Sequence, residues 1–248
     1  MAWSESFACT SPIAEGPWRS HVLEARRSTA AAAATFSWLA PVYELWARWV
    51  ERAPRRRVLE LARVRDGETV LEVATGTGVQ LVELGRRNPH GRTVGVDFAP
   101  GMVARTRKRL KSAGLDDVEL SQGDARELPF DDATFDVVTN EYMLNLMPHA
   151  DIARAVSELF RVLKPGGRIV VTNMTPGARL RERIWDALYA RGIDVFVNCR
   201  GVLASPVLEE VGFRDVRREA MAPMLFPTEI VTARRAALGV APVTWVSA

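Results

Sequence analysis

Cysteine is scarce in this sequence. Only two of the 248 residues are cysteines, Cys9 and Cys199. Two cysteines are too few for a disulfide framework and too few for a zinc cluster, so each is most simply a free thiol. The sequence therefore predicts neither a metal site nor a fold held together by disulfides.

Long hydrophobic runs are missing as well. Charged residues interrupt every apolar run well short of the roughly 18 residues that suggest a membrane-spanning helix. The first segment, Met1–Trp18, lacks the basic start and apolar core of a secretory signal. We therefore expect a cytoplasmic protein without an integral membrane segment. A chain of this length can bury the core of one three-layer enzyme domain.

The excess of positive charge is small, with a formal net charge of +3. The basic residues are spread through the chain, and the densest runs are Arg55–Arg57 and Arg105–Arg109. We interpret the second run as the solvated face of a helix. No stacking-aromatic motif accompanies either run, so a nucleic-acid partner is not predicted.

The most informative feature of the sequence is the stretch Val70–Gly78, in which an apolar strand runs into a glycine turn. The next residues, Val79–Arg87, have helical character. Dinucleotide sites use the same geometry, but the carboxylate of Glu72 would repel a pyrophosphate, and Leu81 stands where their third glycine would fall. A ligand with a cation, an amine and no phosphate fits better, and S-adenosylmethionine is such a ligand.

Two further segments carry acids where such a ligand would need them. The apolar stretch Arg92–Val96 ends in Asp97, where a doubly wound fold presents an acid to ribose hydroxyls. Alternatively, Asp97 only caps a helix that starts near Pro100. Farther on, Asp124 follows a short strand and could accept a hydrogen bond from an adenine amino group, although taken alone it would be a turn residue.

Five motifs in order, VLEVATGTG, GVDFAPGM, GDARELPF, FDVVTNEYML and LKPGGRIVV, resemble those of the class I S-adenosylmethionine-dependent methyltransferases. The nearest group is the ubiquinone/menaquinone C-methyltransferase-like (methyltransferase type 11) group, and the likeness covers roughly 36–234. It implies an α/β, Rossmann-like fold: a seven-stranded, mostly parallel sheet with an antiparallel last strand, closed by a hairpin of Phe213–Glu219 and Met224–Arg234. It also implies S-adenosyl-L-methionine as the cofactor.

The resemblance also implies which residues bind the cofactor. Glu72, Ala74, Gly76 and Gly78 would line the methionine end, with Tyr43 of the N-terminal region reaching its carboxylate. Asp97 would hold the ribose, Phe98 and Met102 would flank the adenine, and Asp124 with Ala125 would read its edge. Thr75, Gly123 and Asn140 are further cofactor-binding candidates, and Asn140 is also a candidate for the acceptor pocket. Two positions depart mildly from the family pattern: Glu72 stands where aspartate is commoner, and Ala74 where many relatives have glycine.

We predict three regions: an N-terminal helical lid over 1–62, the cofactor-binding domain over 63–238 and a tail over 239–248. The lid prediction rests on the pair Tyr43 and Glu44, which matches a Tyr-acid pair of related enzymes and would place Tyr43 near the methionine carboxylate. The alternatives are a static helix on the sheet edge and a segment whose tryptophans, with Arg52–Arg57, touch a membrane surface.

The acceptor pocket should lie at the carboxyl ends of the strands, where open α/β sheets bind ligands. Methyl transfer is an in-line displacement that needs no universal catalytic residue. Where a proton must be lost, Glu141 or His149 could act as the base, with Tyr142 beside them. Alternatively, His149 only begins a helix. Further pocket candidates are Asn145, Asn173, Met174, Thr175, Phe196, Asn198 and Arg200.

We expect a small acceptor that is apolar or amphiphilic, such as a quinone ring, a lipid head group or a secondary metabolite, methylated at carbon, nitrogen or oxygen. Peripheral membrane contact would suit such a substrate. Arsenic methylation is disfavoured, because it uses several cysteines. The alternatives are a cofactor-binding protein that has lost methyl transfer, such as a cyclase or a regulatory partner, and a nicotinamide-dependent dehydrogenase. The sequence does not indicate the oligomeric state.

Overall fold

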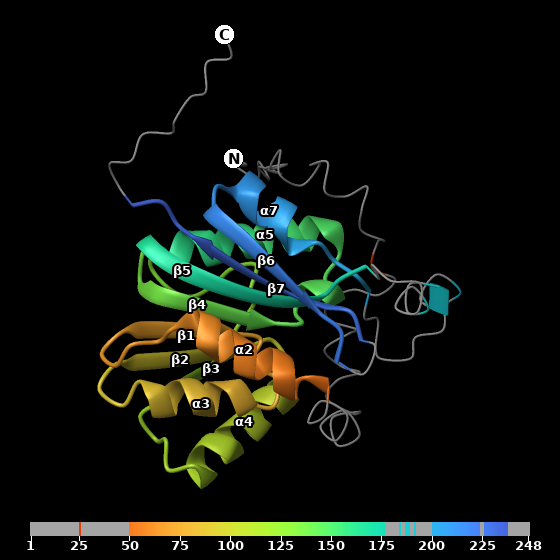
Figure 1. Ribbon diagram of the computed structural model, residues 1–248. Helices are drawn as coiled ribbons and strands as arrows, with labels where there is room; N and C mark the ends of the chain where they lie inside the picture. Colours follow the sequence, from red (N-terminus) through yellow and green to blue (C-terminus); the bar gives the residue numbers. More distant parts are fainter. Residues whose placement is uncertain are drawn as a thin grey trace, which may run out of the picture.

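The structure is a computed structural model that describes residues 25, 50–176, 184, 187, 188, 191, 200–223 and 226–237. Strands and helices mostly alternate along this part of the chain, except that β4 follows β3 and β7 follows β6 without a helix between them (Figure 1). In order they are α2 (Arg52–Ala62), β1 (Thr69–Val73), α3 (Val79–Arg87), β2 (Arg92–Asp97), α4 (Pro100–Ser112), β3 (Glu119–Gln122), β4 (Phe135–Glu141), the 3₁₀ turn η3 (Leu144–Leu146), α5 (His149–Val162), β5 (Leu163–Met174), α7 (Ala204–Val211), β6 (Arg214–Met221) and β7 (Thr228–Arg234).

The strands form one seven-stranded sheet in the order β3-β2-β1-β4-β5-β7-β6. The pairs β1·β2, β1·β4, β2·β3 and β4·β5 are parallel, whereas β7 runs antiparallel to both of its neighbours, β5 and β6. The predicted sheet is therefore confirmed, including its antiparallel last strand. Since the order reverses between β1 and β4, the carboxyl ends of these two strands flank the position where doubly wound folds bind ligands.

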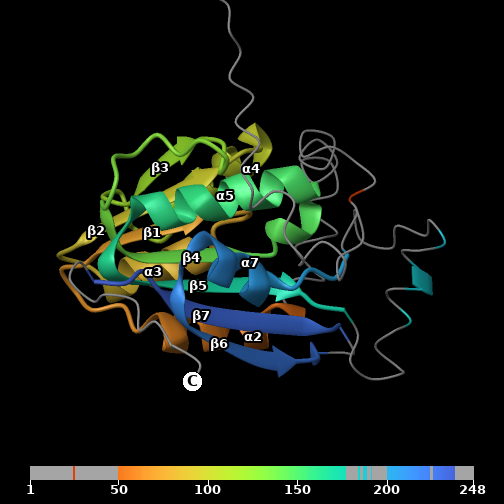
Figure 2. The same cartoon turned by 90° about the horizontal axis from the view of Figure 1, so that it is seen from above.

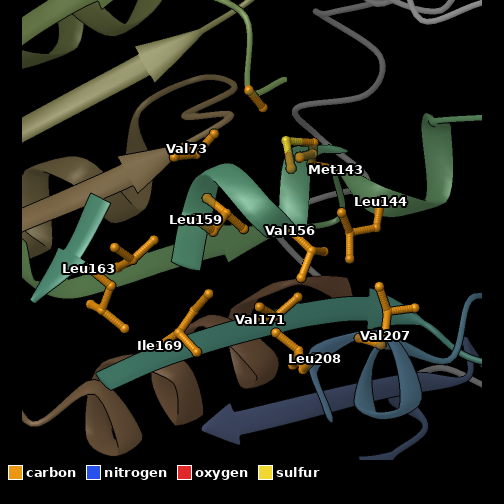
Figure 3. Close-up of a cluster of buried hydrophobic side chains, with 14 of the residues drawn as sticks. Val73, Met143, Leu144, Val156, Leu159, Leu163, Ile169, Val171, Val207 and Leu208 are labelled. Carbon is orange, nitrogen blue, oxygen red and sulfur yellow. The ribbon is translucent and has the colours of Figure 1, made fainter. Parts of the chain in front are cut away.

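Helices cover both faces of the sheet, because the central strands are apolar on both sides. Val70 of β1 packs with Val58 of α2 and Leu84 of α3, whereas Leu71 and Val73 belong to the cluster beneath α5 and α7. Figures 1 and 2 show α2 and α3 on one side of the sheet and α5 and α7 on the other. In Figure 3, side chains of β5, α5 and α7 gather into this second core. Successive side chains of a strand point to opposite faces of the sheet, so alternate residues pack against different helices.

Most element bounds follow the sequence pattern closely. The helix expected at Val79–Arg87 has those bounds. The second hairpin strand was expected from Met224 and instead begins at Thr228, directly after Pro227, which has no backbone N–H to donate to a ladder. The bulge between Phe135 and Val137 lets β5 start as early as Leu163.

The three predicted regions are only partly within the described residues. Helix α2 packs on the sheet through Val58, Leu59 and Ala62. Tyr43, the rest of the proposed lid and the tail over 239–248 lie outside the described residues, so their roles stay predictions. In the part that is described, no helix has both the length and the apolarity to cross a membrane, and no cluster of side chains could hold a metal ion.

Candidate cofactor and acceptor site

The glycine turn after β1 has an unusual backbone. Ala74, Gly76 and Gly78 all have positive φ angles, of 62°, 54° and 77°. The left-handed region costs a residue with a Cβ roughly 1–2 kcal/mol, so Ala74 is strained where many relatives have glycine. Its N–H donates to the carbonyl of Val96 at 2.7 Å, which fastens the start of the turn to β2.

Helix α4 packs against the glycine turn and donates two side-chain hydrogen bonds to its carbonyls. Thr106 donates its hydroxyl to the carbonyl of Gly76 at 2.9 Å, and Arg109 donates Nε to the carbonyl of Thr77 at 2.7 Å. A Cβ on Gly78 would lie 2.7 Å from Cγ2 of Thr106, so only glycine lets the helix approach this closely. The interpretation of Arg105–Arg109 as a solvated face is therefore wrong for Arg109, whose guanidinium positions the turn.

Asp97 links the turn to α4. Its Oδ2 accepts the N–H of Gly76 at 2.7 Å, and its Oδ1 accepts the N–H of Ala99 at 2.9 Å. Burial raises the pKa of this carboxyl to about 6, against the effect of the two N–H groups. The bond to Ala99 lies at the start of α4, as the alternative role for Asp97, capping that helix, predicted. The carboxylate also lies at the end of β2, where ribose binding is predicted.

The predicted adenine-edge residues lie next to this carboxylate. The N–H of Gly123 donates to the carbonyl of Asp97 at 3.1 Å, and Ala125 is buried. Asp124 accepts hydrogen bonds from the guanidinium of Arg126, through Nε at 3.0 Å and Nη2 at 2.6 Å, and from its backbone N–H at 2.9 Å, and these lower the pKa of its carboxyl. Arg126 also reaches Asp151 on α5 at 2.9 Å. Arg126 therefore holds the carboxylate of Asp124 in place. The sequence analysis did not name it as a site residue, although it lies within the GDARELPF motif.

Met102 and Phe98 are the residues predicted to flank the adenine. Met102 is buried on α4, and Phe98 is half-buried directly after β2, with its carbonyl accepting from Gln122 at 3.2 Å. Thr75 is buried within the turn, and its hydroxyl has no hydrogen-bond partner in the described part of the chain.

Buried acids lie on the α2 side of the sheet. Glu72 is 1% exposed, and burial, then the neighbouring carboxyl of Glu141, raises its pKa well above the usual range. Glu141 ends β4, and burial raises its pKa to about 7. Arg55 of α2 donates Nε to Glu141 at 3.4 Å and Nη2 to Glu51 at 2.7 Å. Arg55 is therefore paired within the fold, whereas the side chain of Arg56 is exposed, and the membrane interpretation of Arg52–Arg57 stays a prediction.

Tyr142 directly follows this acid. It has a positive φ of 52°, and its hydroxyl lies 3.1 Å from that of Thr228. It packs with the buried apolar side chains of Val50, Met174 and Phe226, at the carboxyl ends of β4 and β5. Strained backbone conformations of this kind cluster at functional sites.

The other pocket candidates separate into two groups. Asn145 donates Nδ2 to the carbonyls of Met174 and Arg200, at 2.9 and 2.6 Å, and accepts the N–H of Met174 at 3.0 Å. These bonds make Asn145 a structural bridge rather than a group directed at substrate. Asn140, by contrast, donates to the carbonyl of Val73 at 2.8 Å, and its Oδ1 is buried without a partner in the described residues.

The remaining candidates lie toward α5 and α7. His149 is buried at the first position of α5, as its alternative interpretation predicted. Arg200 is also buried and donates to the carbonyl of Met147. Thr175 accepts from Arg218 at 2.8 Å, whereas Asn173 is buried with both amide atoms unpartnered in the described region. Phe196 and Asn198 lie outside the described residues.

Comparisons with known proteins agree with this geometry. Residues 70–167 match a family model described as a methyltransferase domain. A ubiquinone/menaquinone biosynthesis C-methyltransferase of Geobacter sulfurreducens is 38% identical over 207 residues, which cover 73% of this chain and 79% of that protein. The chain belongs to the ubiquinone/menaquinone C-methyltransferase family. S-adenosyl-L-methionine is the cofactor that this family and fold imply.

Other relatives share the same core. A demethylmenaquinone methyltransferase of Thermus thermophilus is 40% identical over 145 residues, covering 57% of this chain and 64% of that protein. A phosphatidylethanolamine N-methyltransferase of Cereibacter sphaeroides is 39% identical over 138 residues, covering 53% and 65%. These two matches thus span slightly less than two thirds of each relative.

Solved structures establish the fold alone. The [4+2]-cyclase SpnF superposes with a TM-score of 0.69 at 20% identity, covering 87% of this chain and 98% of that one. A putative methyltransferase of Bacillus halodurans superposes with a TM-score of 0.61 at 19% identity, covering 75% and 100%. Because the same fold carries a cyclase, the reaction has to be inferred from the site.

Proposed function

We propose that this chain transfers the methyl group of S-adenosyl-L-methionine to a ring carbon of a small quinone-type acceptor. The main support is the Geobacter relative, which is matched over 79% of its length and is named for C-methylation in quinone biosynthesis. The acceptor is a small molecule rather than a nucleic acid. The cytoplasmic location and contact with a membrane surface stay predictions.

The residues present fit the cofactor. A Cβ on Gly76 would meet nothing within 4 Å, so the turn leaves open space beside its backbone, and Oε2 of Glu72 is buried without a donor in the described chain. We assign Glu72, Ala74, Thr75, Gly76, Gly78 and Asn140 to the methionine end, Asp97 to the ribose, and Phe98, Met102, Gly123, Asp124 and Ala125 to the adenine. When bound, the cofactor would supply a methyl group on a positive sulfur and leave as a neutral thioether. The ring carbon that gains the methyl group would lose its proton to a base, for which Glu141 and His149 are the candidates, or to water.

The apolar cluster of Val50, Tyr142, Met174 and Phe226 supports an aromatic acceptor. Tyr142 directly follows β4 and Met174 ends β5, so the cluster lies where the carboxyl ends of these two parallel strands meet. The rings of Tyr142 and Phe226 are 6.1 Å apart and tilted by 57°, an arrangement that stabilises aromatic pairs.

Tyr142 would act as a hydrogen-bond donor rather than as a base. Burial raises the pKa of its phenol well above 10, so the group stays protonated at neutral pH. A protonated phenol can orient a hydroxyl or carbonyl oxygen of the acceptor ring. Of the two candidate bases, Glu141 lies on the α2 side of the sheet, whereas His149 begins α5 on the opposite side, so only one of them can face a given acceptor atom.

The test is an incubation of the full chain with methyl-labelled cofactor and either a demethylated menaquinone analogue or phosphatidylethanolamine. We expect label in the quinone ring, and a rate reduced about ten- to a hundredfold in Tyr142→Phe, because one positioned hydrogen bond is lost. Thr134→Val, which directly precedes the amino end of β4 and so lies at the opposite edge of the sheet from the proposed site, is the control and should keep the wild-type rate. Label in the phospholipid amine and none in the quinone would refute the proposed acceptor.

A further inference from the structure

The loop between β3 and β4 carries the acid assigned to the adenine, and α5 holds this loop along one side. Leu128 of the loop donates its N–H to Oε2 of Glu158 at 2.8 Å. Arg161 donates Nη2 to the carbonyl of Leu128 at 3.0 Å and Nη1 to the carbonyl of Phe130 at 2.7 Å. Asp151 belongs to the first turn of the same helix, about two turns before Glu158, so these two acids share a helix face.

Asp151 is connected to the assigned acid through one guanidinium. Arg126 donates Nη1 to Oδ2 of Asp151 at 2.9 Å, and it donates Nε and Nη2 to the carboxylate of Asp124 at 3.0 and 2.6 Å. The three side chains are only 17–28% exposed, so water competes less for these contacts than on an open surface. Because a guanidinium is rigid and planar, a contact at one edge fixes the direction in which the other edge donates.

The direction of the Asp124 carboxylate decides what it can recognise. The hydrogen bonds from Arg126 lower the pKa of this carboxyl, so at neutral pH it is ionised and only accepts hydrogen bonds. Adenine carries an amino group at position 6, which donates, whereas a 6-oxo purine carries an oxygen there, which only accepts. A carboxylate held toward position 6 favours adenine, whereas a carboxylate that rotates into water distinguishes the two bases less.

We propose that Asp151 of α5 is a positioning residue for adenine recognition, which acts through Arg126 on the direction of the Asp124 carboxylate. The inference rests on the proposed function, because it needs the adenine of the cofactor to lie at Asp124. It assigns a role in cofactor selection to a helix that contributes no residue to the assigned cofactor site.

The experiment measures calorimetric binding of two probes, S-adenosylhomocysteine and S-inosylhomocysteine, in which an oxo group replaces the 6-amino group. The wild-type chain should bind S-adenosylhomocysteine about ten- to a hundredfold more tightly. Asp151→Asn keeps the size of the side chain, removes its charge and should lower this preference about three- to tenfold. Asp151→Glu keeps a carboxylate and should restore the preference to within about threefold of wild type. The matched control is Asp131→Asn, at an exposed acid of the same loop, which should keep the wild-type preference.

A second measurement tests whether Asp151 acts through Arg126. In the Arg126→Ala background, Asp151→Asn should change the preference between the probes by less than about twofold, because the connection to Asp124 is already broken. A further loss as large as the loss in the wild-type background would mean that Asp151 acts by another route, and it would overturn the proposal.

The remaining outcomes separate this inference from the proposed function. Equal wild-type affinity for the two probes would overturn the inference and leave the methyl transfer untouched, even if Asp151→Asn did not fold. If Asp151→Asn weakened the binding of both probes by the same factor, Asp151 would have a structural role only. Failure of the wild-type chain to bind S-adenosylhomocysteine would instead refute the cofactor site, and with it the proposed function.

Discussion

Replacing Gly76 by alanine should separate folding from cofactor binding. Gly76 has a φ of 54°, and an added Cβ would have nothing within 4 Å. Its N–H donates to Asp97 and its carbonyl accepts from Thr106, and neither bond is blocked by a methyl group. The substitution therefore adds only the strain of a left-handed backbone, about 1–2 kcal/mol of unfolding free energy.

Gly114, just beyond the end of α4, is the matched control. It has a φ of 69° and equally open space around its Cβ, but it lies away from the strand ends. Gly114→Ala should lose the same 1–2 kcal/mol, measured by urea denaturation, and bind S-adenosylhomocysteine as wild type does.

Gly76→Ala, by contrast, should weaken S-adenosylhomocysteine binding by about tenfold or more, since the methyl group would occupy the space assigned to the cofactor. Calorimetry on both variants gives the comparison. If Gly76→Ala binds S-adenosylhomocysteine as tightly as Gly114→Ala, the cofactor does not approach this turn and the assignment of the methionine end is wrong.

Three further predictions concern arginines and one acid. Arg235 donates Nη1 to three carbonyls near the end of α5, at 2.7–2.9 Å, so Arg235→Ala should lower the unfolding free energy by about 1–3 kcal/mol, whereas Arg234→Ala should change it by less than about 0.5 kcal/mol in the same urea titration. Burial raises the pKa of Asp97 from 3.8 to about 6 in the folded protein, so the folded state holds this proton more tightly than the unfolded chain does. The resulting contribution to the free energy of unfolding is complete below pH 4 and is lost as the pH rises through 6. Urea titrations of the free protein should show this as a loss of about 3 kcal/mol, and Asp97→Asn should remove that part of the pH dependence. Arg126→Ala removes the hydrogen bonds that orient Asp124 and should weaken S-adenosylhomocysteine binding about three- to tenfold in calorimetry, with Arg126→Lys intermediate. An unchanged affinity would mean that cofactor binding does not depend on the orientation of Asp124 by Arg126.

Local sequence patterns were sufficient to predict the helix and strands that hold the candidate site residues. Helix α3 has its predicted bounds because the left-handed Gly78 precedes it and two arginines complement its last turn. The apolar periodicity of β1, β2 and β4 likewise placed Glu72, Asp97 and Glu141 at or near strand ends before the sheet was known.

Contacts between distant residues could not be predicted in this way. Arg109 and Thr77 are 32 positions apart, and Arg55 and Glu141 are 86 apart. Arg109 stands in a basic run that the sequence pattern assigns to solvent, and Arg55 in one that could also have touched a membrane surface. Only the packing of α4 and α2 brings each guanidinium to its partner. For the same reason Asn145 suggested a pocket residue, although its amide joins η3 to β5.

The most direct test of the cofactor assignment is a calorimetric titration of the full chain with S-adenosylhomocysteine and, separately, with NAD. The buried carboxyl of Glu72, near the end of β1 just before the glycine turn, favours a cation and opposes a pyrophosphate. We expect S-adenosylhomocysteine to bind in the micromolar range, weakened by about 1–3 kcal/mol in Asp97→Ala, and NAD to bind far more weakly. Tighter binding of NAD than of S-adenosylhomocysteine would contradict the account.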